Sequence, residues 1–240
     1  MSMCTLEKRG DLFLLTLTGD DEHRFHPDTT ASVLSLLEQA KSQSTRGSVL
    51  ITTAHGKFFS NGFDLAWAQS AGSQTGAVNR MHQMVESFKP VVAALFDLPM
   101  PTIAALNGHA AASGLMFALS HDYVFMRNDR GVLYMSEVDL GLPLPDYFAA
   151  MFAAKIGTSI ARRELLLSGK KIGGEEAVGL GIVDSAAHDS AEGVVEATVS
   201  LGESLAGKKW NGEVYASIRK SLYPGVCAML GLTAKIAASP

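Results

Sequence analysis

The amino-acid sequence predicts an α/β fold with a mainly parallel sheet. Strand-like and helix-like segments alternate over the first two-thirds of the chain, and such alternation requires crossover connections between parallel strands. With 240 residues, of which 47% are hydrophobic and 18% charged, the chain can bury a substantial core. From about Pro145 onward the pattern becomes mainly helical.

The individual elements follow from hydrophobic periodicity and from the residues that flank each run. Residues 102–106 (TIAAL) form a fully apolar run typical of a buried strand, whereas residues 28–40 carry apolar side chains at helical spacing after a capping Asp28. The other expected strands are 12–17, 48–53, 122–126 and 132–134, with Val138 also strand-like. The other expected helices are 78–96, kinked at Pro90, then 112–119, 161–167, 175–180, 191–205 and 213–222.

Two regions are expected within this single chain. Residues 1–185 are predicted to form the α/β core with the ligand site, and residues 186–240 a C-terminal helical region used for oligomerisation. The sequence has no internal repeat, no low-complexity segment and no linker that would force an independent second domain.

Composition and charge exclude several classes of function. The net charge is −4 and no basic cluster suggests a nucleic-acid partner. Cys4 and Cys227 stand near opposite ends without metal-ligand spacing, so neither a metal site nor a disulfide framework is expected. The N-terminus lacks an apolar signal core, and the most apolar stretch, 91–106, is too short and too interrupted to cross a membrane. We therefore expect a soluble intracellular protein.

Three segments carry residues suited to chemistry: 57–65, 107–116 and 136–142. The first two are turns of small residues after strands, where backbone amides can approach a ligand and favour negative charge. Two such turns facing each other can form an oxyanion hole, and Glu137 in the third segment can remove a proton beside it. Taken singly, each turn is equally explained by tight helix-on-sheet packing, and Glu137 by a solvated or salt-bridged carboxylate.

Taken together, these segments resemble the enoyl-CoA hydratase/isomerase (crotonase) family. Residues 58–65, FFSNGFDL, are similar to the family's first oxyanion turn, and residues 101–125, PTIAALNGHAAASGLMFALSHDYVF, to its second. Residues 136–142, SEVDLGL, resemble the segment with the catalytic glutamate, and residues 161–184, ARRELLLSGKKIGGEEAVGLGIVD, a later helical segment. The resemblance implies a crotonase-like spiral of ββα units with a C-terminal helical region. Within the family, the sequence resembles the plant peroxisomal 3-enoyl to 2-enoyl-CoA isomerases most strongly.

The family pattern assigns roles to individual residues of this sequence. It implies that Phe63 and Ser113 donate the two backbone amides to the thioester oxygen, and that Glu137 is the general base. Ser113 stands where many relatives have glycine, but the donor is the main-chain N–H. The implied contacts to the acyl-CoA substrate are Ser60, Asn61, Gly62, Asp64, Leu65, Gly114 and Met116.

Met116 distinguishes between the activities found in this family. Hydratases have a second glutamate at this position, which helps to activate water, and methionine cannot transfer a proton. The resemblance therefore implies a one-base isomerase that moves the double bond of a 3-enoyl-CoA to give the trans-2-enoyl-CoA of fatty acid β-oxidation. No cofactor is implied, because coenzyme A is part of the substrate.

Further contacts are open to two interpretations each. Pro145, Tyr147 and Phe148 are either the lining of the acyl pocket or ordinary core. His26, in a segment that often touches the adenosine of coenzyme A, either contacts the nucleotide or is an ordinary surface histidine.

Three rival functions have some support in the sequence. The segment GHAAASG resembles the nucleophile turn of Clp-type peptidases, with Ser113 as nucleophile, but no histidine stands in the expected zone around 136–138. A non-catalytic acyl-CoA-binding protein would retain the fold without turnover. Another crotonase activity is the third rival: a hydratase, against which Met116 argues, or a dienoyl-CoA isomerase, for which Asp139 or Asp146 would supply the further acidic groups.

Assembly and location are implied by the resemblance alone. Family members are usually trimers or pairs of trimers, so a homotrimer or hexamer is expected. The terminal residues Ala238-Ser239-Pro240 do not form a Ser-Lys-Leu-type peroxisomal address, which the most similar relatives usually carry. The resemblance predicts a peroxisomal protein whose natural sequence continues further; otherwise the protein is cytoplasmic.

Overall fold

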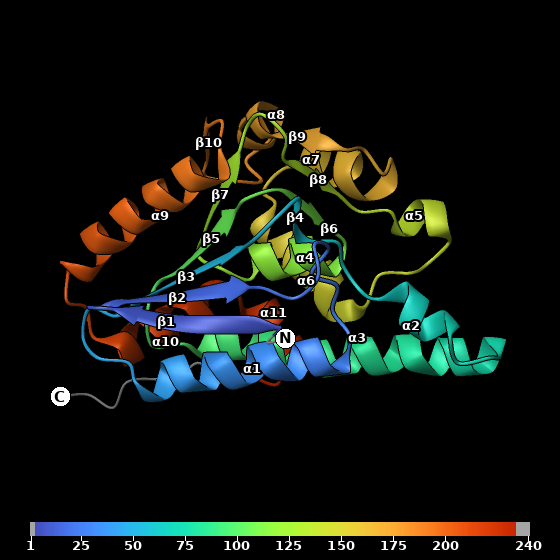
Figure 1. Ribbon diagram of the computed structural model, residues 1–240, viewed down its shortest axis with the longest axis horizontal. Coiled ribbons are helices and arrows are strands. Elements are labelled where there is room, and N and C mark those ends of the chain that lie inside the picture. The colour runs from blue at the N-terminus through green and yellow to red at the C-terminus, as the bar shows by residue number, and fades with distance from the viewer. Residues whose placement is uncertain (1–2, 234–240) are drawn as a thin grey trace.

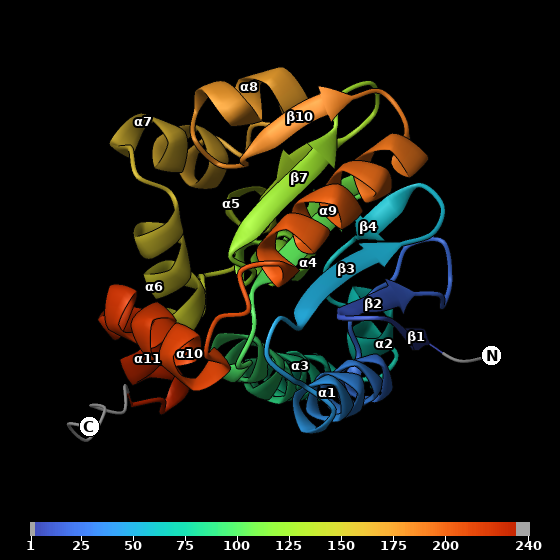
Figure 2. The ribbon, with the colours of Figure 1, turned by 90° about the vertical axis from the view of Figure 1, so that its left-hand side faces the viewer.

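A six-stranded sheet forms the centre of the computed structural model, which describes residues 3–233 (Figures 1 and 2). Across the sheet the strands are β1 (Cys4–Arg9), β2 (Leu12–Leu17), β3 (Val49–Ala54), β5 (Thr102–Leu106), β7 (Tyr123–Arg127) and β10 (Ser185–His188). Only the β1–β2 pair is antiparallel among these neighbours. The predicted α/β class with a mainly parallel sheet is confirmed.

A smaller four-stranded sheet lies beside the first and gives the chain its spiral path (Figure 1). Its strands are β4 (Phe58–Ser60), β6 (His109–Ala111), β8 (Val132–Tyr134) and β9 (Ile172–Gly173). β4, β6 and β8 run parallel, and each follows directly on a strand of the large sheet. Because a helix comes after each of these pairs of strands, the structure repeats the ββα unit that the resemblance implied.

The helices cover both faces of the large sheet. α1 (Pro27–Ser42) and α3 (Gln74–Asp97) pack against each other beneath one face, and α9 (Ala191–Ala206) lies along the other (Figure 2). The remaining helices are α2 (Leu65–Gln69), α4 (Ser113–Leu119), α5 (Glu137–Leu140), α6 (Asp146–Lys155), α7 (Ser159–Arg162), a π-helical turn η1 (Arg163–Leu167), α8 (Gly174–Gly179), α10 (Gly212–Leu222) and α11 (Pro224–Leu230).

Alternation along the strands separates two hydrophobic cores. In β2, Phe13, Leu15 and Leu17 point to the core on the α1 and α3 side, whereas Leu12 points to the core beneath α9. Every residue of β3 and β5 is buried, which explains why these two segments are nearly continuous apolar or β-branched runs.

The second half of the chain is less helical than the sequence indicated. β10 pairs in parallel with β7, and it spans residues 185 and 186, between which the domain boundary was predicted. α9 then packs on β3 and β5 of the sheet. Val138 lies in α5 rather than in a strand, and α3 continues through Pro90. Residues 234–240, with the C-terminal tripeptide, lie outside the described part of the chain.

His121 is a buried histidine whose charge state makes folding sensitive to acid. It is 1% exposed; its Nδ1 lies 2.9 Å from the Phe117 carbonyl oxygen and its Nε2 lies 2.8 Å from Thr52 Oγ1. Burial lowers the pKa of His121 to about 4. Between pH 6.5 and about pH 4, His121 binds a proton in the unfolded chain but not in the folded protein. Its contribution to the unfolding free energy is therefore fully present above pH 6.5 and is lost as the pH falls.

We therefore expect His121→Gln to remove part of the acid sensitivity of the fold. Wild type should lose about 2 kcal/mol of unfolding free energy through this histidine on going from pH 7.5 to pH 5. The glutamine variant should lack that component, whatever its stability at pH 7.5. Urea unfolding of both proteins at the two pH values measures the difference, and equal pH dependence in the two proteins would contradict the assignment.

Candidate active site

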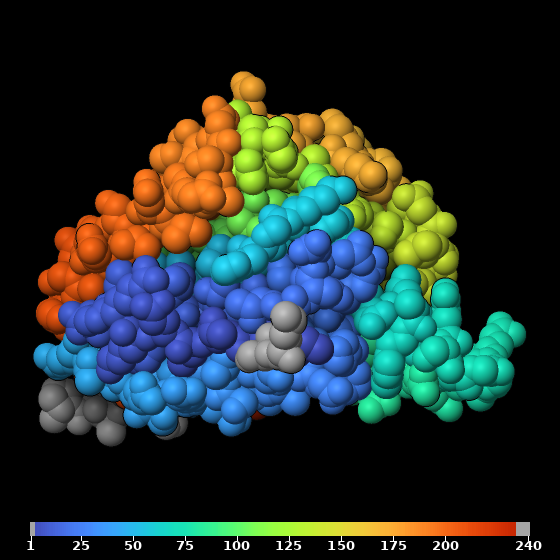
Figure 3. Space-filling model, viewed as in Figure 1, coloured from blue at the N-terminus to red at the C-terminus, as the bar shows by residue number. Residues whose placement is uncertain are grey.

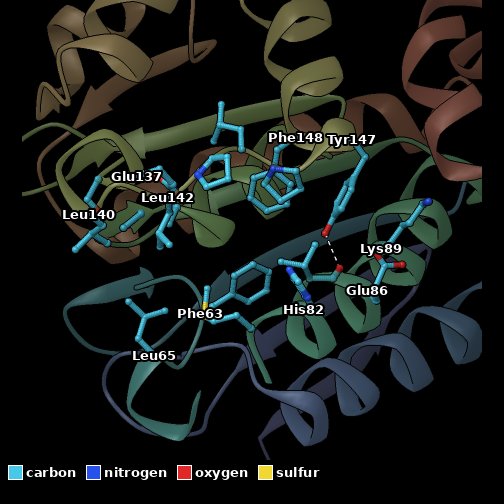
Figure 4. Close-up of a pocket in the computed structure, with 18 of the residues that line it drawn as sticks. Phe63, Leu65, His82, Glu86, Lys89, Glu137, Leu140, Leu142, Tyr147 and Phe148 are labelled. Atoms are coloured by element: carbon cyan, nitrogen blue, oxygen red, sulfur yellow. Dashed lines mark hydrogen bonds between the residues drawn. The ribbon is translucent and has the colours of Figure 1, made fainter. Parts of the chain in front are cut away.

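A cavity of about 780 Å³ opens between α3 and the segment from Ser136 to Phe148 (Figure 4). Glu137, Leu140 and Leu142 lie on one wall, and Phe63 with Leu65 on the opposite wall, at the first of the two turns. The turn before α4 contributes Ala111 and Ala112 to the lining. The cavity therefore brings together residues from all three chemical segments found in the sequence.

The first turn depends on a glycine that touches the second turn. Gly62 has φ +81°, in the left-handed region, and a Cβ at this position would lie 2.9 Å from the Ala112 Cβ and 3.6 Å from the Ser113 nitrogen. The Phe25 N–H donates to the Gly62 carbonyl at 2.8 Å, and the Asp64 N–H donates to the Phe25 carbonyl at 3.0 Å. Any larger residue at position 62 would push the two turns apart.

The second turn is held in an unusual backbone conformation. Ala112 has φ +49° and ψ −122°, which a non-glycine residue seldom adopts. Its N–H donates to the Tyr134 carbonyl at 3.1 Å, and the next residue, Ser113, begins α4. A Cβ on Gly114 would lie 2.3 Å from the Ser60 carbonyl oxygen, so α4 rests directly on β4.

Two backbone amides of the described chain lack an acceptor where the turns meet, one on Phe63, which lines the cavity, and one on Ser113, which is buried and does not line it. Among residues 3–233, neither the Phe63 N–H nor the Ser113 N–H has a hydrogen-bond acceptor, although their neighbours Gly62, Asp64 and Ala112 all do. Buried backbone donors are nearly always paired, so these two require an explanation. They are the amides that the family pattern assigns to the thioester oxygen.

Glu137 provides the carboxylate of the cavity. It is the first residue of α5, and its Oε2 atom is buried without a hydrogen-bond partner in the described part of the chain. Burial raises the pKa of this carboxyl group, against the lowering effect of the backbone amides of Glu137 and Ser136. A carboxylate with one unpaired oxygen and a raised pKa, facing a mostly apolar cavity, is suited to accept and return a proton.

The walls around Glu137 are mostly apolar. Pro145, Tyr147 and Phe148 line the cavity, as the acyl-pocket interpretation expects, together with Val85 of α3. The Tyr147 hydroxyl donates to the Val85 carbonyl at 2.8 Å, so α6 and α3 are joined across one end (Figure 4). The Phe148 ring is stacked 6.2 Å from the Phe63 ring. Such a lining favours an acyl chain over water.

Asn61 and Leu65 are the predicted substrate contacts that line the cavity. The predicted contacts Ser60 and Asp64 do not line the cavity, because their side chains are used within the fold. The Ser60 hydroxyl is buried and donates to the His23 carbonyl at 2.8 Å, and the Asp64 carboxylate caps α2 by accepting the Trp67 N–H at 2.9 Å.

Met116 and Gly114 also do not line the cavity. Met116 is completely buried in the main core, within α4. His26 accepts the Asp28 N–H at 3.3 Å through Nδ1 and caps α1. Gly62 and Gly114 thus act on the site through the close packing of the two turns, and the contact roles that the family pattern implies for these residues and for Met116 stay predictions.

The sequence did not point to several residues of the cavity. α3 contributes one face, with His82, Glu86 and Lys89 at helical spacing (Figure 4). Arg24 and Tyr134 line the cavity beside the first turn. Helical periodicity could identify the α3 face, but only the fold shows that α5 and α6 lie opposite this face.

The catalytic rival functions need a serine nucleophile with a histidine base, or additional acidic groups in the cavity. The Ser113 hydroxyl is buried and, within residues 3–233, has no hydrogen-bond partner, so it lacks the histidine that a serine nucleophile needs. Asp146 lines the cavity from an exposed position, and Asp139 is exposed and outside it. The described residues contain no cluster of three or more potential metal ligands, and none of their helices is long and apolar enough to span a membrane.

Comparison with known proteins identifies the family. A sequence model of the enoyl-CoA hydratase/isomerase family matches residues 15–224. An Arabidopsis thaliana protein named enoyl-CoA delta isomerase 3 is 86% identical over 97% of both chains. Another, named enoyl-CoA delta isomerase 2, peroxisomal, is 82% identical over 99% of both chains.

The solved structures agree on the fold. An apo structure described as an enoyl-CoA isomerase of Mycobacterium tuberculosis superposes with a TM-score of 0.82 at 19% identity, over 96% of each chain. At that identity the likeness concerns the fold alone, and the sequence matches supply the family. On the evidence of the sequence matches, this chain belongs to the enoyl-CoA hydratase/isomerase family.

Proposed function

We propose that this protein is an enoyl-CoA delta isomerase, which moves the double bond of a 3-enoyl-CoA to give the trans-2-enoyl-CoA of fatty acid β-oxidation. The observation that carries the proposal is the nearly full-length identity of 86% and 82% to two proteins named enoyl-CoA delta isomerases. The cavity supports it with one half-buried carboxylate, Glu137, whose Oε2 has no hydrogen-bond partner among residues 3–233, and with two backbone amides that have no acceptor there.

In the proposed mechanism a single base moves one proton. The N–H groups of Phe63 and Ser113 bind the thioester oxygen, and Glu137 removes a proton from the carbon next to the thioester carbonyl. The resulting dienolate carries negative charge on that oxygen, where the two amides stabilise it. Glu137 then returns the proton to the γ carbon, and the double bond becomes conjugated with the carbonyl.

A hydratase would need a second group to activate and orient water. At the position of the second hydratase glutamate, this chain has Met116, which is buried and cannot exchange a proton. The apolar walls of the cavity also favour return of the proton over addition of water. An isomerase therefore agrees better with the site than a hydratase does.

The proposal extends to the ligand, the assembly and the location. The pantetheine arm of coenzyme A would run past Asn61 and Leu65, with no cofactor besides the coenzyme A of the substrate. A homotrimer or hexamer follows from the family pattern. A peroxisomal location is supported by the names of relatives that are 82% and 48% identical.

The first test is a direct assay with trans-3-hexenoyl-CoA. We expect conversion to the conjugated 2-enoyl-CoA, followed as the rise in ultraviolet absorbance of the conjugated thioester, with little hydration when trans-2-hexenoyl-CoA is supplied instead. Hydration at a rate similar to isomerisation would identify a hydratase. Tight binding of hexanoyl-CoA without turnover of the unsaturated thioester would identify a non-catalytic binding protein.

A further inference from the structure

We propose that Tyr134 is a positioning residue that holds the two amide-bearing turns at a fixed separation. The inference rests on the proposed function, because it assigns Tyr134 to the oxyanion site formed by Phe63 and Ser113. Tyr134 is the last residue of β8 and lines the cavity three residues before Glu137. It is bonded to both turns, by its main chain to one and by its side chain to the other.

The main chain of Tyr134 holds the second turn. β8 pairs in parallel with β6, in a register that places Ala111 opposite Tyr134. The Tyr134 carbonyl accepts the Ala112 N–H at 3.1 Å. Since Ala112 is the residue with positive φ immediately before Ser113, this bond helps to fix the direction of the Ser113 N–H.

The side chain of Tyr134 holds the first turn. Its hydroxyl donates to the Asn61 side-chain oxygen at 3.0 Å. The other end of the same amide is also used, because the Asn61 Nδ2 donates to Glu22 Oε1 at 3.1 Å and the Asn61 backbone N–H donates to the Glu22 carbonyl at 2.8 Å. Asn61 is therefore held on three sides, two residues before the Phe63 amide.

Charged side chains lie on both sides of the hydrogen-bonded group Tyr134, Asn61 and Glu22, which we call the polar clamp. Lys171 Nζ lies 5.4 Å from the centre of the Tyr134 ring. On the far side, Arg24 donates through Nε to Glu22 at 2.6 Å and through Nη1 to the carbonyls of Asn61 and Phe63 at 3.3 and 3.4 Å. Tyr134 is the member of this clamp that bonds to both turns. Its hydroxyl makes the bond to the first turn, at Asn61, and its carbonyl makes the bond to the second turn, at Ala112.

The test is Tyr134→Phe, which removes the hydroxyl and keeps the ring and the main-chain bond. We expect kcat for trans-3-hexenoyl-CoA to fall roughly fivefold to tenfold, the worth of one neutral hydrogen bond, with KM unchanged. A role in folding alone would lower the melting temperature and leave kcat at the wild-type value.

A second readout follows the oxyanion site without turnover. Acetoacetyl-CoA, a β-ketoacyl thioester, ionises to an enolate that absorbs in the near ultraviolet, and a well-placed pair of amides lowers the pKa of the bound ligand. Tyr134→Phe should raise that ligand pKa, whereas binding of the saturated hexanoyl-CoA should not change. Because this titration needs no isomerisation, it tests the positioning role even if wild type fails to isomerise 3-hexenoyl-CoA.

Three further variants separate the proposed role of the Tyr134 hydroxyl from a general effect of removing a tyrosine hydroxyl. Tyr123→Phe removes a hydroxyl outside the cavity, from half-buried Tyr123 of β7, and should match wild type in both readouts. In the double variant Asn61→Ala/Tyr134→Phe, kcat should be no lower than in Asn61→Ala alone, because the hydroxyl acts through Asn61. Additive losses, or an unchanged kcat and ligand pKa in Tyr134→Phe, would overturn the proposal.

Discussion

Glu137→Gln is expected to lower kcat for isomerisation of trans-3-hexenoyl-CoA by about 10²- to 10⁴-fold, the usual contribution of a general base. Glutamine has nearly the same shape as glutamate but cannot accept the proton. The Glu137 carboxyl already lies in the cavity with a buried, unpaired oxygen, so the substitution should change the chemistry and leave acyl-CoA binding nearly unchanged. Initial rates and the dissociation constant of hexanoyl-CoA measure the two effects separately.

The pH dependence of the wild-type rate follows from the same carboxyl group. Burial raises the pKa of Glu137, and the ionised form is the one that removes the substrate proton. The rate should therefore increase with pH through an apparent pKa above the ordinary range of glutamate, and then level off. The residual activity of Glu137→Gln should lack this step.

A matched control lies two residues along the same short helix. Asp139 is exposed and does not line the cavity, so Asp139→Asn makes the same change from carboxylate to amide without touching the site. It should retain wild-type kcat. Full activity in Glu137→Gln would mean that another carboxylate is the base, and Asp146, which lines the cavity from the start of α6, is the alternative candidate.

The local parts of this site could be predicted because each is encoded in a short, unusual stretch of sequence. Gly62 has to be glycine at φ +81° in contact with Ala112, and Gly114 has to be glycine against Ser60. Close backbone packing of this kind requires small residues just after a strand, and such residues can be recognised in the sequence. The same logic identified the apolar strands β3 and β5, which are buried on both faces.

The rest of the site depends on which elements meet in space, and periodicity does not show this. The face of α3 with Val85 and Glu86 could have faced solvent or another helix. It lines the cavity because the segment before α6 returns across it. β10 was missed for a related reason: its four residues, SAAH, have no apolar run, and the strand exists because β7 offers a free edge to it.

Arg219→Met is expected to lower the unfolding free energy by about 3–5 kcal/mol, the cost of removing one partner of a buried ion pair. Arg219 comes from α10 and is 3% exposed. Its Nε and Nη2 donate to the two oxygens of Asp122 at 2.7 and 2.6 Å. Without the guanidinium, the Asp122 carboxylate at the start of β7 would keep its charge in the interior with its main partner gone.

The same guanidinium also satisfies the end of α3. It donates to the carbonyls of Leu95, Phe96 and Leu98 at 3.1, 3.2 and 2.8 Å, and to the Met100 carbonyl in the connection to β5. The last carbonyls of a helix have no partner within it, and a buried helix end needs donors from elsewhere. Methionine fills much of the volume of arginine but offers no donor, so the loss should come from these unpaired polar groups.

Chemical denaturation of wild type, Arg219→Met and a surface control measures this effect. Arg163 forms an exposed ion pair with Glu164, its side chain being 59% exposed, so Arg163→Met should cost less than about 1 kcal/mol. The double variant Arg219→Met/Asp122→Leu should recover part of the loss, because it removes the stranded charge. A similar, small loss in both single variants would mean that the carbonyls and Asp122 find other partners.

Loss of the Arg219 contacts should also loosen the acyl wall of the cavity. α10 leads directly into α11, which packs on α6 and contributes Met229 to the cavity lining. α6 carries Tyr147 and Phe148, two residues of the proposed acyl wall. Loosening α10 should therefore raise KM for the acyl-CoA more than it lowers kcat, since the main contacts of α10 and α11 are with α3, α6 and each other. A selective fall in kcat in Arg219→Met, measured well below its melting temperature, would contradict this separation of stability from chemistry.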